Sequence, residues 1–286
     1  MDQTTSGWIN GLLGVLIFSG SLPATRVAVA GFDPLFLTLL RAAIAACLVL
    51  AMLIALHDRL PDLGDLLPLV VVALGVVVGF PLLTAFALRR ITSAQSVVFI
   101  GLLPLATAIF GVVRGGERPR PAFWLCSGVG SALVAGFALV RGGGGGMAGN
   151  VLMLAAVVVC GLGYAEGARL SRRLGGRQVI SWALVVALPV TASLAIATRP
   201  GSAAGIGRSA WIGLAYVSVL SMFVGFIFWY RGLAKGGIAG VGQLQLLQPL
   251  FGLAIAATLL GEPVSRAMLA VTLAVVVCVA GAKRFA

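Results

Sequence analysis

The amino-acid sequence predicts an all-α integral membrane protein with ten transmembrane helices, arranged as two inverted five-helix repeats. Three observations lead to this fold class. Of the 286 residues, 60% are hydrophobic and only 10% are charged, whereas a water-soluble domain carries about 25% charged residues. The apolar residues form ten stretches that are long enough to cross a bilayer, and the two halves of the sequence resemble each other.

The ten apolar stretches are separated by short polar connections. A helix that crosses the hydrocarbon core needs about 20 mostly apolar residues. Turn or helix-start signals, such as Asp33-Pro34 and Pro61-Asp62, mark several of the boundaries. Because the connections are short, neighbouring helices should be antiparallel. The expected helices cover residues 8–29, 33–56, 65–88, 92–114, 120–140, 148–170, 178–198, 209–233, 237–260 and 264–283.

The second half of the sequence matches the first at a shift of 145 residues. Pro104-Leu105 falls on Pro249-Leu250, and Gly116-Glu117 falls on Gly261-Glu262, with no gap between the two pairs. A repeat of five helices ends on the opposite side of the membrane, so the second repeat must insert upside down. We expect a first repeat over residues 1–141, a glycine-rich link over 142–147 and a second repeat over 148–286.

The net charge of +12 comes from arginine and lysine residues near the ends of the apolar stretches. This distribution follows the positive-inside rule, and we therefore do not expect a nucleic-acid partner. With the N-terminus inside, twelve basic residues fall on the inner face and seven on the outer face. The bias predicts that both termini lie in the cytoplasm.

Specific residues of this sequence also resemble a known family. The fourth helix of each half carries Pro-Leu followed twelve residues later by Gly-Glu, and the second helix begins with Asp33-Pro34 and contains Arg41. With ten helices in two inverted repeats, these features resemble the EamA-like drug/metabolite transporter superfamily over essentially the whole chain. Within it, the sequence is most similar to bacterial aromatic amino acid exporters. The position in the second repeat equivalent to Arg41 is Val186, so Arg41 is not a symmetric element.

The resemblance implies a multi-pass exporter of the bacterial inner membrane. Its small-molecule substrate would cross by alternating access through a central cavity lined by helices 1, 3, 4, 6, 8 and 9, with membrane lipid around the protein. The implied substrates are amino acids with aromatic or other apolar side chains, and another small metabolite or a drug is the alternative. Arg41 would then lie outside the cavity. The sequence does not fix the oligomeric state, and a monomer is compatible with it.

Glu166 is an acidic residue well inside an apolar stretch, in the sixth expected helix. An ionisable group at that depth is costly and indicates a function by default. Its carboxylate could contact a substrate ammonium group or take up a proton. The alternative is an ion pair near the inner interface with Arg169 or Arg173 of the same helix.

Glutamines are concentrated in the ninth expected helix, where Gln243, Gln245 and Gln248 must find polar partners inside the membrane. We expect at least one of them to line the cavity, with Gln243 and Gln245 as candidates for binding the charged ends of an amino acid. Hydrogen bonding between helices is the alternative. Gln95 in the fourth helix is a candidate of the same kind.

Aromatic residues supply candidates for an apolar wall. Phe80, Phe99 and Tyr164 lie deep in the third, fourth and sixth helices, which the resemblance places around the cavity. Their rings could stack against an apolar or aromatic part of the substrate, and ordinary packing is the alternative. Ser21, in an interrupted part of the first helix, is a further candidate for substrate contact.

Five residues are expected to interrupt or bend helices: Pro23, Gly79, Pro81, Pro104 and Pro249. Two of these prolines are repeat partners, so their bends should be related by symmetry. Discontinuous helices often expose backbone groups to a substrate near the middle of the membrane. A packing kink without a ligand is the alternative for each of them.

Two rival function classes fit the sequence less well. An intramembrane enzyme would need buried catalytic groups, but the sole histidine, His57, lies in a loop. Cys47, Cys126, Cys160 and Cys278 lie in apolar stretches without paired spacing, so we interpret them as packing residues and expect no metal or cofactor. A channel would use a ring of identical filter elements, whereas an inverted repeat with kinked helices favours alternating access.

Overall fold

The computed structural model describes residues 3–115, 120–141, 146–201, 205–236 and 241–283, and over these residues it is helical, with no strand. Three short segments have other helical forms: π-helical η1 (Ala73–Gly79) and η2 (Tyr216–Gly225), and 3₁₀-helical η3 (Gln243–Leu247). The α-helices are α1 (Gln3–Ser19), α2 (Ser21–Ala28), α3 (Pro34–Ala55), α4 (Leu63–Val72), α5 (Phe80–Leu88), α6 (Ser93–Ile100), α7 (Leu103–Gly115), α8 (Pro121–Arg141), α9 (Gly146–Leu174), α10 (Gly176–Ala197), α11 (Arg208–Ala215), α12 (Phe226–Gly236), α14 (Gln248–Leu260) and α15 (Arg266–Lys283).

Seven continuous helical runs within the described residues are long and apolar enough to cross a membrane. Three shorter apolar helices, Pro121–Leu133, Leu250–Leu260 and Arg266–Cys278, accompany them. In chain order these segments follow the ten expected stretches, but the count of ten spans stays a prediction because three fall short of the full length. The seven long runs are Thr5–Ala28, Pro34–Ala55, Leu63–Leu88, Gln95–Arg114, Gly146–Leu174, Gly176–Ala197 and Arg208–Gly236.

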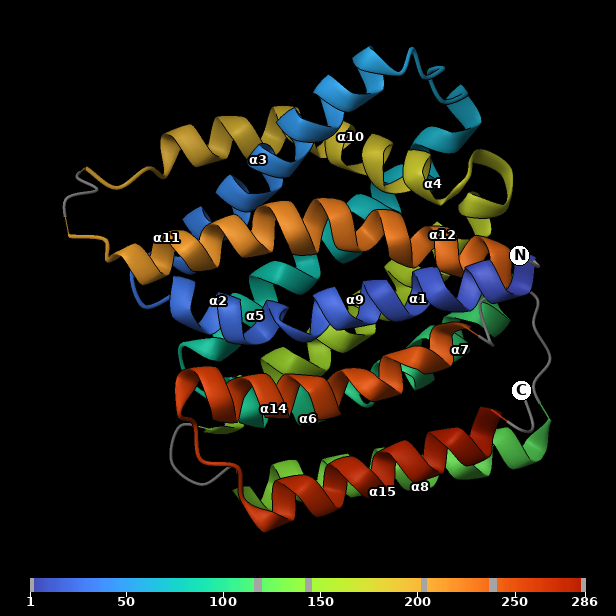
Figure 1. Cartoon of the computed structure of the whole chain (residues 1–286), viewed down its shortest axis with the longest axis vertical. Coiled ribbons are helices and arrows are strands. Elements are labelled where there is room, and N and C mark those ends of the chain that lie inside the picture. The colour runs from blue at the N-terminus through green and yellow to red at the C-terminus, as the bar shows by residue number, and fades with distance from the viewer. Residues whose placement is uncertain (1–2, 116–119, 142–145, 202–204, 237–240, 284–286) are drawn as a thin grey trace.

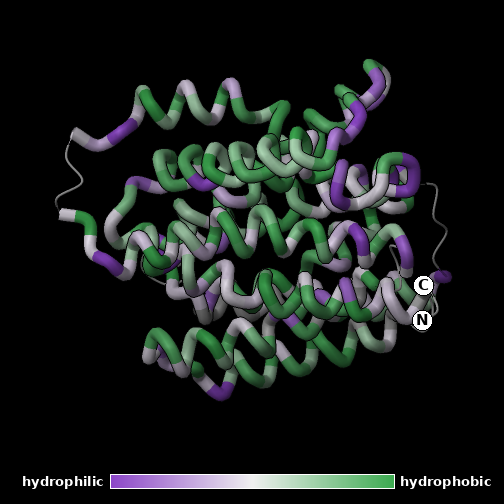
Figure 2. Tube along the Cα trace, turned by 45° about the horizontal axis from the view of Figure 1, so that its top comes forward, coloured by the Kyte–Doolittle hydropathy of each residue, from purple (hydrophilic) through white to green (hydrophobic). Residues whose placement is uncertain are grey.

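The helices lie side by side with their long axes in roughly one direction, and both ends of the chain lie at the same end of the bundle (Figure 1). Hydrophobic residues run along the middle of the helices, while hydrophilic residues gather mostly near their ends and in the connections (Figure 2). This distribution is the one that a bilayer requires, because an uncompensated polar group is costly in hydrocarbon.

Contacts between helices connect the first part of the chain with the second part in a regular pattern. α3 packs against α10 and α8 against α15, and in both cases the two helices are counterparts at the 145-residue shift. α1 packs against α12, and α5 packs in the corresponding way against α9. Two halves related by a two-fold axis would pair in this way. The inverted repeat stays a prediction, and residues 142–145 of the expected link lie outside the described part.

Helix interruptions recur at matching positions of the two halves. α7 and α14 correspond residue for residue at the 145-residue shift, and Pro104 and Pro249 are each the second residue of their helix. Proline is tolerated there because the first turn of a helix leaves its N–H groups unpaired. The other three kink candidates lie next to interruptions as well: Pro23 follows the break before α2, Gly79 ends η1, and Pro81 lies in the first turn of α5.

Glycine allows α1 and α12 to cross at backbone contact. A Cβ atom on Gly232 would lie 2.6 Å from the backbone N of Gly11 and 2.8 Å from its Cα. A Cβ on Gly7 would lie 2.6 Å from the backbone N of Gly236. Small residues at such crossings let membrane helices associate through close packing. Since α1 and α12 belong to opposite halves of the sequence, this crossing holds the halves together.

Substituting Gly232 with alanine should therefore destabilise the protein by about 1–3 kcal/mol, the usual cost of overpacking, because a backbone cannot move aside as a flexible side chain can. Gly128→Ala in α8 is the matched control, since a Cβ there meets nothing within 4 Å. It should leave stability unchanged or raise it by about 0.5–1 kcal/mol, since alanine is the better helix former. Unfolding of the purified variants in detergent measures both effects, and equal stability of the two variants would contradict the close crossing.

Candidate substrate-binding cavity

A narrow cavity lies between the two halves of the chain. Its free space is about 30 Å³, which is room for a few water molecules at most, so its walls are nearly in contact. The lining residues are Phe18, Ser21, Leu22, Thr25, Arg41, Val76, Phe80, Pro81, Thr84, Leu103, Tyr164, Ser221, Met222, Phe226 and Gln248.

The cavity lies where the helices are interrupted. Ser21, Phe80, Leu103, Phe226 and Gln248 all line it, and each is the first residue of a helix that follows a break or a change of helical form. Irregular backbone inside a membrane protein is tolerated where it is buried in protein or lines a cavity. The cavity therefore lies at the helix interruptions.

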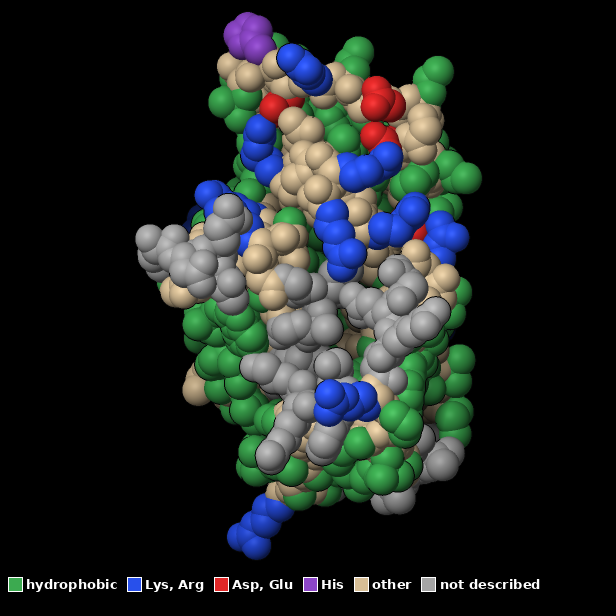
Figure 3. Space-filling model, turned by 90° about the vertical axis from the view of Figure 1, so that its right-hand side faces the viewer, with side chains coloured by type: hydrophobic (Ala, Val, Ile, Leu, Met, Phe, Trp, Pro, Cys, Tyr) green, Lys and Arg blue, Asp and Glu red, His purple; other side chains and the backbone are tan. Residues whose placement is uncertain are grey.

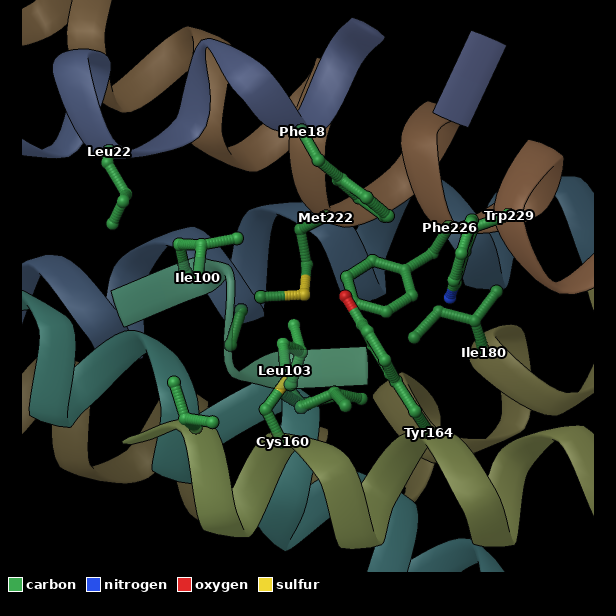
Figure 4. Close-up of a cluster of buried hydrophobic side chains, with 14 of the residues drawn as sticks. Phe18, Leu22, Ile100, Leu103, Cys160, Tyr164, Ile180, Met222, Phe226 and Trp229 are labelled. Carbon is green, nitrogen blue, oxygen red and sulfur yellow. The ribbon is translucent and has the colours of Figure 1, made fainter. Parts of the chain in front are cut away.

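Aromatic rings make up one wall of the cavity. The rings of Phe18 and Phe226 meet edge to face with centroids 4.9 Å apart, and Tyr164 lies 6.1 Å from Phe226. Figure 4 shows Tyr164 extending from α9 toward Met222 and Phe226. Phe80 is half-buried on α5, on the cavity lining. Such a wall suits an apolar or aromatic part of a ligand.

Polar groups on the cavity wall come from both halves of the chain. The Ser21 and Ser221 hydroxyls lie 2.7 Å apart and are hydrogen-bonded to each other. Thr84 donates to the carbonyl of Pro81 at 3.0 Å. Gln248 donates through Nε2 to the Phe18 carbonyl at 3.4 Å, while its buried Oε1 has no partner among the described residues. Of the described glutamine side chains in the ninth expected helix, Gln248 is thus the one that reaches the cavity.

Arg41 lies on the cavity wall, so the prediction that it lies outside the cavity is wrong. Its residue is only 5% exposed, and its buried Nε has no hydrogen-bond partner within the described part of the chain. The prediction placed whole helices inside or outside the cavity, but an arginine side chain is long enough to reach a cavity from a flanking helix. The sequence did contain a signal, because an arginine inside an apolar stretch indicates a functional site.

Three of the other sequence candidates line the cavity, and four lie elsewhere in the described structure. Ser21, Phe80 and Tyr164 are on the lining. Gln95 forms a capping box at the start of α6: its backbone N donates to Thr92 Oγ1, and its Oε1 accepts from the Thr92 backbone N, both at 3.1 Å.

Phe99 is fully buried in the hydrophobic core and is not on the lining. Gln245 is also buried and off the lining, and its Nε2 has no partner among the described residues. The side chain of Gln243 lies outside the described part of the structure. Phe99 and Gln245 therefore do not line the cavity in this conformation.

The internal repeat contains a signal for two residues that sequence reasoning did not place on the site. Ser221 and Gln248 are the repeat partners of Val76 and Leu103 at the 145-residue shift, and all four line the cavity. When a residue lines the cavity in one half, its repeat partner in the other half is therefore a candidate lining residue. Thr25 and Thr84 carried no comparable signal.

Glu166 lies in an ion-pair group beside the C-terminal end of α7 and does not line the cavity. Arg114 of α7 donates through Nε to one carboxylate oxygen at 2.9 Å, and Arg169 of α9 binds the other oxygen. The Glu166 side chain has no exposed surface, whereas both arginine side chains are 46% exposed. This geometry favours the ion-pair interpretation that the sequence left open, with Arg114 rather than Arg173 as the second partner.

Further ion pairs also join the first half of the chain to the second half. Arg173 of α9 pairs with Asp65 of α4, and Arg177 of α10 donates two hydrogen bonds to Asp58, one of them at 2.8 Å. Figure 3 shows Lys and Arg side chains beside Asp and Glu on the end of the molecule that carries His57. Hydrogen bonding to Arg177 lowers the pKa of the Asp58 carboxyl. The pair is therefore fully charged at neutral pH and is lost only as the pH falls through this lowered pKa.

α7 and its counterpart α14 are packed to different extents. α7 packs extensively against α9 beside the Arg114–Glu166 pair, while its counterpart α14 packs much less closely against α1. An apolar groove of about 310 Å³ lies between α2, α14 and the α11–η2 segment, with Tyr216, Ile255 and Leu259 on its wall. The helices are therefore packed more closely beside the ion pairs than around this groove.

Comparison with known proteins agrees with this architecture. The sequence model of the EamA-like transporter family matches residues 5–140 and again residues 147–282. A Bacillus subtilis (strain 168) protein named uncharacterized transporter YdeK is 63% identical over 286 residues, which cover all of both chains. A crystal structure with 20% identity matches 99% of each chain with a TM-score of 0.72 and shows the fold. The chain is a multi-pass membrane transporter that belongs to the EamA-like transporter family.

Proposed function

We propose that this chain is a secondary transporter that exports small metabolites with an apolar body across the bacterial plasma membrane. Amino acids with aromatic or other apolar side chains are the first candidates. The central cavity supports this proposal, because its aromatic wall suits an apolar side chain and its hydroxyl, amide and guanidinium groups suit a polar head. Outward direction is what the resemblance to exporters implies, and another small metabolite or drug is the second candidate.

The proposed mechanism is alternating access between the two halves. In the structure, α7 lies on α9 and ion pairs join the halves at the charged end. Opening that end requires α7 to leave α9, with the Arg114–Glu166 pair breaking. Closing the other end requires α14 to approach α1 and α2 and fill the apolar groove. The helix breaks at Leu103 and Gln248 lie at the cavity, and in this mechanism they serve as the hinges of the two moving helices.

We also propose that the charged end faces the cytoplasm. Both chain ends lie there (Figure 1), and Figure 3 shows a concentration of Lys and Arg on this face. An excess of basic residues is typical of the cytoplasmic side. The structure would then be closed toward the cytoplasm and closer to opening toward the outside.

Counterflow in liposomes tests the proposed function. Vesicles that contain the purified full-length chain are loaded with unlabelled phenylalanine, and uptake of labelled phenylalanine, tryptophan and threonine is measured. A carrier gives a transient, saturable accumulation of label, which a channel does not give. Absence of counterflow for all three amino acids would contradict the amino-acid assignment.

Phe80→Ala should reduce the transport of phenylalanine and tryptophan by roughly 2- to 12-fold, which corresponds to losing about 0.5–1.5 kcal/mol of ring contact. Threonine transport should change less, because threonine has no ring to stack. Phe86→Ala is the matched control, since Phe86 is another half-buried phenylalanine of α5 but does not line the cavity. If Phe80→Ala reduces the transport of all three amino acids equally, the ring serves packing and not selectivity.

A further inference from the structure

We infer that Arg41 binds the anionic group of the transported molecule, so that the cavity selects carboxylates with an apolar body and does not require an ammonium group. This inference rests on the proposed function and adds the charge of the substrate. A transporter with this site differs from one that requires an amino acid, because its substrate would not need an amino group.

The first observation is the state of the Arg41 side chain. It reaches the cavity from α3 and is 5% exposed, and its Nε is buried without a hydrogen-bond partner among the described residues. No ion pair joins it to a carboxylate in the described part of the chain. A guanidinium cannot escape its charge by deprotonation in a protein. Its burial therefore calls for an anion or water in the cavity as a partner.

The second observation is that no described acidic side chain lines the cavity. Each is placed elsewhere: Asp58, Asp65 and Glu166 are bound by arginines, and Asp62 lies by the loop that carries His57. Asp33 caps α3, and Glu262 accepts two hydrogen bonds from Ser93 at the start of α6. A substrate ammonium group would thus find no carboxylate in the cavity, while a substrate carboxylate would find Arg41.

The third observation is the kind of polar group that accompanies Arg41. Thr25, Thr84, Ser21 and Ser221 contribute hydroxyl groups to the same lining. Thr84 already donates to Pro81 and one serine donates to the other, so the hydroxyls of Thr25 and of the accepting serine can donate to a carboxylate. Arg41 is the single arginine among the described lining residues and lies with an aromatic wall, which fits one carboxylate on an apolar body. A polyanion such as a nucleotide phosphate would need several basic groups.

Charge balance then predicts the order in which three molecules with the same phenyl group bind to the cavity. With 3-phenylpropanoate, the carboxylate and Arg41 form a neutral pair. Phenylalanine also places an ammonium in the cavity, where only neutral groups such as the Gln248 Oε1 can accept from it. Phenethylamine places a second positive charge beside Arg41 and should bind worst. A hydrogen-bonded charge pair of this kind changes affinity by roughly 10- to 100-fold.

Binding and transport of these three molecules test the inference. The purified full-length chain is titrated with each molecule in detergent, with thermal stabilisation as the readout, and each is then tested in the counterflow assay. We expect 3-phenylpropanoate to bind at least as well as phenylalanine and roughly 10-fold or more tighter than phenethylamine. Arg41→Gln should remove the preference for the carboxylates, and Arg41→Lys should retain part of it.

Arg26→Gln is the matched control, because Arg26 of α2 donates to the Leu88 carbonyl at the end of α5 and does not line the cavity. It should retain the order of the three ligands. Phenethylamine binding as tightly as the carboxylates, failure of both carboxylates to bind, or an Arg41→Gln variant with unchanged preference would each overturn the inference. If Arg41→Gln does not fold, the order of the ligands on the unaltered chain and on Arg41→Lys decides the question.

The two proposals can fail separately. Counterflow of phenylalanine that is unaffected by Arg41→Gln would leave the transport function standing and remove the role of Arg41. Carboxylate binding that depends on Arg41 without any counterflow would support the anion site and remove the proposed transport of these molecules.

Discussion

Phe99→Ala is expected to lower the free energy of unfolding by about 3–5 kcal/mol, the usual cost of removing a buried phenylalanine ring. Phe99 has no exposed surface and belongs to the hydrophobic core, away from the cavity lining. Transport of phenylalanine, tryptophan and threonine should therefore fall together, in proportion to the loss of folded protein. Unfolding of the purified variant and counterflow of the three amino acids provide the two measurements.

Phe80→Ala provides the contrast to this result, since its ring lies on the cavity wall and only partly in the core. It should alter the ratio of phenylalanine to threonine transport with a smaller loss of stability. A Phe99→Ala variant that kept its stability but changed this ratio would show that Phe99 contacts the substrate in another conformation.

Glu166→Gln is expected to open the charged end of the transporter. The carboxylate of Glu166 is fully buried and binds Arg114 of α7 and Arg169 of α9. Because both arginines are partly exposed, water can replace part of the lost interaction, and the effect should be smaller than the 3–5 kcal/mol typical of a broken buried pair. We expect a shift of about 1–3 kcal/mol between the closed and open states, or roughly 5- to 150-fold in their ratio.

Native Cys160 can report this opening. It lies on α9 and is 1% exposed, so a thiol reagent should reach it only when α7 moves away. In a background without the other three cysteines, its labelling rate should rise in the Glu166→Gln variant. Asp33→Asn is the control, since asparagine can replace aspartate as an N-cap and Asp33 caps α3 without joining α7 to α9.

The pH response of transport separates the two interpretations of Glu166. If Glu166→Gln abolishes the response to a pH gradient while Cys160 labelling stays unchanged, Glu166 carries a coupling proton and does not hold the closed end. If labelling rises and the pH response persists, the carboxylate acts as a tie between the halves.

The parts of the structure that could be predicted from sequence are those governed by local composition. Apolar stretches gave the helices, because a membrane leaves no alternative for an apolar segment of that length. Pro104 and Pro249 marked helix interruptions, since proline removes a backbone donor wherever it occurs. The family membership followed from the Pro-Leu and Gly-Glu pattern, whereas the aromatic amino-acid specificity remains a proposal.

The parts that could not be predicted depend on side chains from distant segments. Glu166 meets Arg114 across 52 residues of sequence, and nothing local distinguishes this partner from Arg173. Gln95 looked like a cavity residue, but its position three residues after Thr92 makes a capping box, a pattern that local reading could have found. Arg41 was misplaced because its side chain extends farther than the helix that carries it.

The coincidence of helix breaks and cavity lining limits how this transporter can evolve. Ser21, Phe80, Leu103, Phe226 and Gln248 each begin a helix and each face the cavity. A substitution at one of these positions changes both what is bound and how easily the attached helix segment turns. Substrate specificity and turnover rate should therefore change together, because a substitution that alters the bound substrate also alters the rate of the conformational change. Second-site changes that restore speed should then map to the helix crossings, such as Gly11 with Gly232, and not to the cavity itself.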